Sequence, residues 1–141
     1  MDKNLQKIED FIAQHHVLTL ATSVNDDVSA CSLFYAYDTS SRSFIVASSE
    51  ETLHIQQIHK NPKVAGNILL ETQEVGKIQG LQFRGIFKTV EDAKLKTLYF
   101  KTFPYALALR PKLWQIQVDY FKLTDNRLGF GKKLIWQESS L

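Results

Sequence analysis

The sequence predicts a mainly β protein with some α-helix: an antiparallel barrel of six to seven strands with about three helices at its margins. Runs rich in β-branched and aromatic residues follow one another along the chain, and short segments with turn chemistry separate them. No regular alternation of strands and helices indicates a parallel sheet. Because 141 residues, 44% of them hydrophobic, suffice for one core, we expect a single domain over residues 1–141.

The first element is an amphipathic helix that we expect to end near His15, because apolar residues recur at helical spacing among charged ones. These apolar residues are Leu5, Ile8, Phe11 and Ile12. Three strand-like runs come next and predict an antiparallel meander. They cover residues 17–22, 28–37 and 44–48.

A short helix is expected after the third strand. Ser48 and Glu51 have the spacing of a capping box, and Pro62 follows the end of the apolar pattern. A further helix is expected over residues 90–103, and Pro104 ends it. The remaining strands are expected over residues 63–70, 78–88, 114–120 and 134–136.

Composition excludes several function classes. A formal charge of +2, from 17 Lys and Arg against 15 Asp and Glu, gives no concentrated basic face, so we expect no nucleic-acid partner. The polar N-terminus does not resemble a signal peptide, and no run approaches the roughly 20 apolar residues of a membrane span. The lone Cys31 cannot form an internal disulfide, which fits a reducing compartment. Together these features predict a cytoplasmic protein without a membrane partner.

The motifs of common enzyme classes do not occur. The sequence has no glycine-rich phosphate loop, no Gly-x-Ser-x-Gly and no cysteine pair at metal spacing. His15 and His16 are neighbours, and His54 and His59 are five residues apart, so neither pair presents two ligands on one helix face and we expect no metal site. Cys31 lies in an apolar run and is expected to be a small buried hydrophobe.

The segment over residues 48–54 carries the most chemical information. It passes from a strand end into a helix start, where hydroxyl groups and free backbone N–H groups can hold a phosphate. Ordinary N-capping by Ser48 or Ser49 is the alternative. Glu50 and Glu51 also lie at this helix start, where two carboxylates repel an anion.

The order of elements, with a short helix ending in Asn61-Pro62 and a strand carrying Gly-Leu-Gln-Phe-Arg-Gly at residues 80–85, resembles the pyridoxamine-phosphate-oxidase-like FMN-binding split barrels. Residues 124–136, Thr-Asp-Asn-Arg-Leu-Gly-Phe-Gly-Lys-Lys-Leu-Ile-Trp, are similar to the uncharacterised YhbP-type branch, as is Phe103-Pro104. The resemblance covers nearly the whole chain. It implies a split β-barrel, FMN as cofactor and a homodimer with the site at its interface.

The resemblance also implies which residues contact FMN. Thr52 and His54 match a hydroxyl and a basic position of the phosphate grip, whereas Leu53 stands where relatives commonly have Arg and so reduces the positive charge. The second strand is expected to run along the flavin, and the third to form the opposite wall. The residues concerned are Ser32, Leu33, Phe34, Val46, Ala47 and Ser48.

Four further residues are candidates. Gln82 lies on the strand that, in such dimers, reaches the flavin of the other subunit; alternatively it is a solvent-facing polar residue. Lys132, Lys133 and Trp136 belong to the C-terminal stretch and could close the site, the lysines meeting phosphate or substrate anions and the indole covering the ring. Alternatively they are a solvated pair and a core anchor.

The function implied is a flavin-dependent oxidation or reduction of a small molecule, with NADH or NADPH as a candidate donor. Because the flavin carries the redox chemistry, no catalytic acid or base is required. Two alternatives remain open. One is a haem-binding or haem-degrading split barrel, with His15, His16 and His54 as candidate axial ligands. The other is a non-catalytic flavin carrier or sensor.

Overall fold

The computed structural model describes residues 2–139, where three α-helices and three 3-10 helices surround an eight-stranded antiparallel sheet. The helices are α1 (Lys3–Ala13), α2 (Leu53–Lys60), η1 (Val75–Lys77), α3 (Ala93–Thr102), η2 (Pro104–Leu109) and η3 (Asn126–Leu128). The strands are β1 (Val17–Val24), β2 (Asp27–Phe34), β3 (Ala36–Asp38), β4 (Ser43–Ala47), β5 (Lys63–Leu70), β6 (Gln79–Thr89), β7 (Leu113–Asp125) and β8 (Lys133–Gln137). None of these helices is long and apolar enough to cross a membrane.

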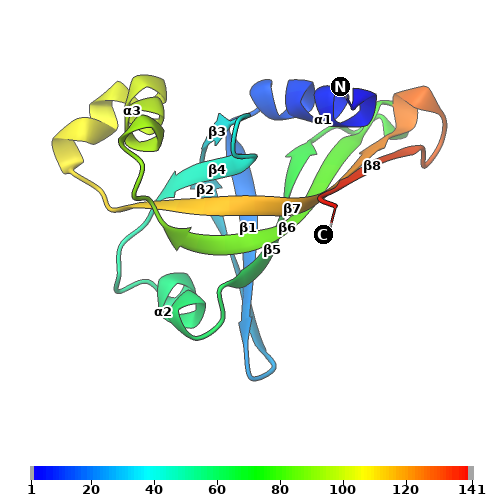
Figure 1. Ribbon diagram of the computed structural model, residues 1–141. Coiled ribbons are helices and arrows are strands. Elements are labelled where there is room, and N and C mark those ends of the chain that lie inside the picture. Colours follow the sequence, from blue (N-terminus) through cyan, green and yellow to red (C-terminus); the bar gives the residue numbers. More distant parts are fainter. Residues whose placement is uncertain (1, 140–141) are drawn as a thin grey trace.

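The sheet curls into a split barrel, as the resemblance implies. Its strand order is β2-β1-β5-β6-β7-β4-β3, and β8 pairs with the C-terminal half of β7 (Figure 1). The first strand of this order, β2, contacts β4, but no ladder joins the two among the described residues. The barrel is therefore open along this seam, and one edge of β2 has no strand partner.

One expected strand is two strands in the structure. The pattern over residues 28–37 is continuous, yet the chain bends at Tyr35, so that β2 pairs with β1 and β3 pairs with β4. The backbone N–H of Tyr35 donates to the carbonyl of His16 at 3.0 Å, and its hydroxyl donates to the carbonyl of Ile12 at 2.6 Å. These two bonds hold the corner where the chain passes from one side of the seam to the other.

Aromatic side chains fill the barrel. Phe44 is completely buried, and its ring lies 4.8 Å from the ring of Phe83 and 5.1 Å from the rings of Tyr35 and Tyr37. Helices cover the barrel and contribute apolar side chains to the same core. These residues are Ile8, Phe11 and Ile12 from α1, and Ile55 and Ile58 from α2.

A second apolar cluster lies outside the barrel, where α3 packs on β3 and β4. Leu95 and Tyr99 of α3 contact a layer that includes Ile45, so residues 43–46 of β4 are buried on both faces. The helix begins at Ala93 rather than at Val90, because the Asp92 carboxylate accepts a hydrogen bond from the Lys94 N–H and caps it there.

Candidate functional site

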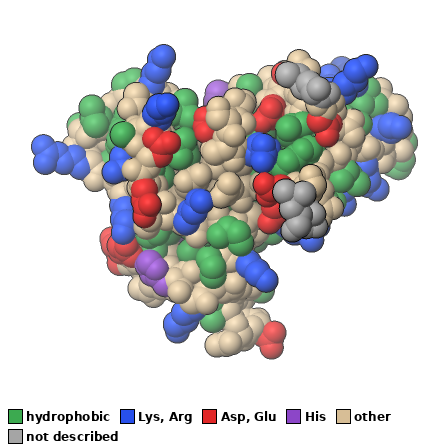
Figure 2. All heavy atoms as spheres, in the orientation of Figure 1, with side chains coloured by type: hydrophobic (Ala, Val, Ile, Leu, Met, Phe, Trp, Pro, Cys, Tyr) green, Lys and Arg blue, Asp and Glu red, His purple; other side chains and the backbone are tan. Residues whose placement is uncertain are grey.

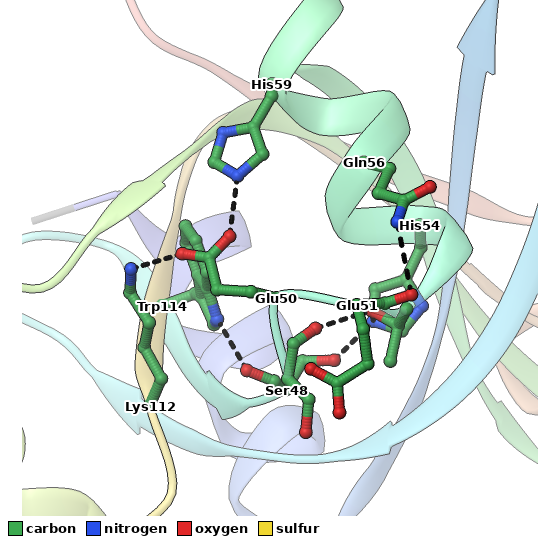
Figure 3. Close-up of polar contacts among 10 residues, drawn as sticks. Ser48, Glu50, Glu51, His54, Gln56, His59, Lys112 and Trp114 are labelled. Atoms are coloured by element: carbon green, nitrogen blue, oxygen red, sulfur yellow. Dashed lines mark hydrogen bonds and ion pairs between the residues drawn. The ribbon is translucent and has the colours of Figure 1, made fainter.

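The chain leaves β4 at Ala47 and enters α2 at Leu53, and the loop between them is anchored to the start of β7. The Ser48 N–H donates to the carbonyl of Lys112 at 3.1 Å, and the Trp114 indole N–H donates to the carbonyl of Ser48 at 2.9 Å (Figure 3). Trp114 is a buried core residue. The strand end therefore holds a fixed position relative to the barrel.

Helix α2 begins later than expected, and the prediction of a capping box at Ser48 and Glu51 is wrong. Thr52 is the N-cap residue, and its hydroxyl donates to the Ser49 carbonyl at 2.8 Å rather than accepting from the helix. A turn over residues 49–52 intervenes and carries Ser48 away from the capping position. The N–H groups of Leu53, His54 and Ile55 consequently have no hydrogen-bond partner among residues 2–139.

Ser48, Thr52 and His54 come together at this helix start. The Ser48 hydroxyl and Nε2 of His54 lie 2.5 Å apart, and the Thr52 hydroxyl lies 3.4 Å from the same nitrogen. Burial lowers the pKa of His54 below its ordinary value of 6.5, so the imidazole is neutral at neutral pH. Two hydroxyl groups and one imidazole are thus within hydrogen-bond distance of one another at the helix end that carries the three free N–H groups.

Helix α2 is tied to the barrel wall by a buried polar network. The side-chain carbonyl of Gln57 accepts from the Thr22 hydroxyl at 2.5 Å and from the Ser29 hydroxyl at 2.9 Å. Gln57 and Thr22 are buried, and Ser29 lies on β2. Since β2 also contacts β4, this strand runs beside both elements that form the helix start.

Glu50 belongs to a second cluster on the same loop. Its carboxylate accepts from the Lys112 ammonium and from Nε2 of His59, the latter at 2.8 Å (Figure 3). The Lys112 ammonium also lies 4.6 Å from the centre of the Trp114 ring. Hydrogen bonds from Lys112 and His59 hold the pKa of Glu50 below its usual range. Sequence reasoning missed Lys112, because it is 62 residues from Glu50 along the chain.

The convex side of the sheet, which we call the outer sheet face, carries small side chains. Ala21 on β1 pairs with Ala30 on β2 and with Ala65 on β5, so three alanines lie in one row. The next row contains Ser32, Thr19, Asn67, Gln82 and Lys122. Ser32 and Gln82, two of the residues implied by the resemblance, therefore share this face.

A groove of about 520 Å³ crosses the outer sheet face. Gln82 and Arg84 from β6 line it together with the small residues of β1 and β5. The Arg84 guanidinium lies 4.1 Å above the Tyr120 ring. Gln82 is exposed, and among residues 2–139 it makes no side-chain hydrogen bond that would fix it structurally.

The other strand candidates differ in which way they point. Phe34 faces outward and is 54% exposed, whereas Leu33 packs against the barrel core. The side chain of Val46 is completely buried, so only its backbone is available to a ligand. Ala47 is half-buried at the strand end.

The C-terminal candidates lie elsewhere in the chain. Lys132 and Lys133 are exposed, and Trp136 packs 5.9 Å from Phe121 with the Arg42 guanidinium 4.9 Å above it. Figure 1 shows β8 near α1, away from α2. Within one chain the structure therefore does not bring these three residues to the helix start.

The remaining titratable candidates stand apart. Burial lowers the pKa of His15, whose ring lies 4.3 Å from that of Phe11, and burial raises the pKa of the Cys31 thiol. In the described part of the chain, no three His, Cys, Asp or Glu residues are grouped so as to hold a metal ion. Figure 2 shows Lys and Arg side chains scattered among acidic ones over the visible face.

Comparisons with known proteins agree on a family and on a fold. The chain is 36% identical to a UPF0306 protein of Photorhabdus laumondii over 138 residues, 96% of each chain. It is 33% identical to the UPF0306 protein YhbP of Escherichia fergusonii over 141 residues, 98% of this chain and 96% of that protein. No family model matches the chain.

Among solved structures, a haem-binding protein from Mycobacterium smegmatis matches with a TM-score of 0.79 at 14% identity, over 97% of this chain and 59% of that one. An FAD-binding protein from Mesorhizobium loti matches with a TM-score of 0.72 at 13% identity, over 84% and 90% of the two chains. A NimC/NimA family protein from Clostridium acetobutylicum matches with a TM-score of 0.70 at 14% identity, over 95% and 93%. At these identities the likeness is one of fold.

Proposed function

The chain belongs to the UPF0306 family, and we propose that it binds FMN at the interface between two copies of itself, with the phosphate at the start of α2. The resemblance to the YhbP-type branch is confirmed by these relatives. The solved structures of this fold include an FAD-binding protein and a haem-binding protein, so a flavin or haem-type ligand is consistent with the fold.

The observation that carries the proposal is the convergence of Ser48, Thr52 and His54 on the start of α2. A phosphate accepts hydrogen bonds, and the three free N–H groups can donate to it directly. The hydroxyl groups of Ser48 and Thr52 can donate as well once a phosphate replaces their present partners, His54 and the Ser49 carbonyl. The positive end of the helix dipole favours an anion there. Ordinary capping does not account for the cluster, since the Thr52 hydroxyl bonds to the Ser49 carbonyl instead of to the helix.

The flavin ring fits β2 in two respects. One edge of β2 lacks a strand partner among the described residues, so its backbone groups are available to the polar edge of an isoalloxazine ring. The outward residues Ala30 and Ser32 are small enough to let a flat ring approach the strand. Because β2 contacts both β4 and α2, its free edge lies next to the elements that form the helix start, and we place the ring and the phosphate of one ligand along that edge.

A second copy of the chain would complete the site. The outer sheet face exposes Val17, Val28 and Phe34, at 42%, 74% and 54%, around the alanine row, a surface that a partner of the same kind can bury. Gln82 on that face is then placed to reach the flavin of the partner. Lys132, Lys133 and Trp136 contribute only if the partner's C-terminal stretch approaches the site.

FMN, when bound, supplies the redox chemistry of a flavin oxidoreductase. The chain's own residues hold the phosphate, fix the ring on β2 and shield one ring face from water. A small-molecule substrate would take the other face, with NADH or NADPH as the candidate electron donor. If neither donor reduces the bound flavin, the protein is a flavin carrier or sensor rather than an enzyme.

The haem alternative finds weaker support in the side chains. An axial ligand needs a free imidazole facing the ligand. His54 is engaged by Ser48 and Thr52, and the ring of His15 packs on Phe11. His16 is exposed and makes no side-chain hydrogen bond among the described residues, so it is the remaining candidate ligand. The outer sheet face presents no histidine among the rows that its paired strands define.

The test is a binding titration with FMN, riboflavin and haem, combined with the absorption spectrum of the purified protein. We expect flavin binding, with FMN preferred over riboflavin, which lacks the phosphate. The double variant Ser48→Ala/Thr52→Ala should reduce that preference, since only the backbone N–H groups would remain, whereas Thr97→Ala, at an exposed helix position, should keep it. Tight haem binding without flavin binding would overturn the proposal.

A further inference from the structure

We propose that Lys112 sets the preference of this site for a phosphorylated flavin, because it neutralises Glu50 and holds that carboxylate away from the start of α2. This inference rests on the proposed function. Among the described residues, the Lys112 side chain makes no hydrogen bond or ion pair with Ser48, Thr52 or His54. Lys112 therefore acts through Glu50 and is a positioning residue.

The loop that would receive the phosphate has an unfavourable charge of its own. Residues 48–59 contain Glu50 and Glu51 but no Lys or Arg, and Leu53 stands at the first helical position. Burial keeps His54 neutral at neutral pH. Without a cation from elsewhere, two carboxylates on the same loop would repel the phosphate.

Lys112 supplies that cation from a different part of the fold. Its ammonium pairs with Glu50, and it is the only Lys or Arg that residues 2–139 place in an ion pair with this loop. Two further contacts hold Lys112 in place beside this loop. Its carbonyl accepts the Ser48 N–H, and its ammonium lies over the buried Trp114 ring. His59 bonds to the other carboxylate oxygen.

The direction of the Glu50 side chain matters as much as its charge. Figure 3 shows it turned toward His59 and Lys112, on the opposite side from His54. A released Glu50 carboxylate could turn to the three free N–H groups of α2, which favour an acidic side chain for the same reason that they favour a phosphate. Lys112, together with His59, therefore keeps an internal competitor away from the phosphate subsite.

The test compares FMN with riboflavin, because only FMN carries the phosphate. Lys112→Met should weaken FMN binding by up to about fivefold, the upper end of the range expected for an exposed ion pair, and leave riboflavin affinity unchanged. The double variant Glu50→Gln/Lys112→Met should restore FMN affinity, since the unpaired carboxylate is gone. Lys60→Met, at the exposed end of α2, is the matched control and should change neither ligand.

Glu50→Gln alone provides an independent measurement if Lys112→Met does not fold. It should tighten FMN binding by about twofold to threefold and leave riboflavin unchanged. Equal loss of both ligands in Lys112→Met, or no rescue in the double variant, would overturn the inference while leaving the proposed function intact. If the unmodified protein binds neither flavin, the proposed function fails and this inference fails with it.

Discussion

Replacing Leu53 by Arg should tighten FMN binding. Leu53 is the first residue of α2 and is 58% exposed, so the change disturbs little packing. The new side chain begins beside the free N–H groups of Leu53, His54 and Ile55, and its guanidinium can reach a phosphate held there. The side chain borders an open surface groove lined by Gln56 and Lys60, which leaves room for the longer chain.

The size of the effect follows from opposing contributions. A hydrogen bond between charged groups is worth about 1.5–3 kcal/mol when sheltered, and exposure of this position reduces it to about 1–2 kcal/mol. A cation near the helix N-terminus costs about 0.3–1 kcal/mol of protein stability in the absence of ligand. We therefore expect Leu53→Arg to bind FMN about fivefold to thirtyfold more tightly, with slightly lower thermal stability.

The assay is quenching of flavin fluorescence, titrated with FMN and separately with riboflavin. Leu53→Gln is the control, because it offers hydrogen bonds without charge and should change FMN affinity little. High salt should reduce the gain of Leu53→Arg. An unchanged dissociation constant for FMN, or an equal gain for riboflavin, would refute a phosphate position at the start of α2.

Three other predictions address the core, the interface and the titration of the site. Phe44→Ala should lower the free energy of unfolding by about 3–5 kcal/mol in urea titrations, because Phe44 is completely buried among four aromatic rings, and a loss below about 1 kcal/mol would contradict that packing. Ala65→Arg should give monomers in sedimentation experiments and abolish FMN binding; a dimer that still binds FMN would exclude the outer sheet face as the interface. His54 has a lowered pKa in the free protein, and a phosphate dianion raises it, so binding takes up a proton and FMN affinity should rise as the pH falls from about 8 to about 6.5. His54→Gln should flatten this dependence, and a dependence that persists in the variant would assign it to another group.

The proximity of candidate residues that are local in sequence was predictable. Ser48, Thr52 and His54 lie within seven residues, at a junction where strand and helix patterns meet, and the structure brings them together. The helix start itself was placed too early, because Ser48 and Glu51 have capping-box spacing while the intervening turn is visible only in three dimensions. Lys112 has no local signal at all, since its partner lies 62 residues away.

The face of a strand on which a side chain lies was predictable only where one face of that strand is solvent-exposed. In β2 the outward residues alternate with inward ones, which separates Ser32 and Phe34 from Leu33. In β4 the barrel core covers one face and α3 covers the other, so alternation is lost and the burial of Val46 could not be predicted. The corner at Tyr35 could not be predicted for a similar reason. The apolar pattern continues through it, although the chain pairs with β1 before the corner and with β4 after it.

The most direct test of the proposed site is a crystal structure of the protein grown with FMN. We expect the phosphate within hydrogen-bond distance of the hydroxyl groups of Ser48 and Thr52, at the free N–H groups of α2, with the ring along β2 and Gln82 of a second copy facing it. A phosphate bound elsewhere, or a flavin enclosed by one copy alone, would contradict the assignment of this helix start as the phosphate subsite of an interfacial flavin site.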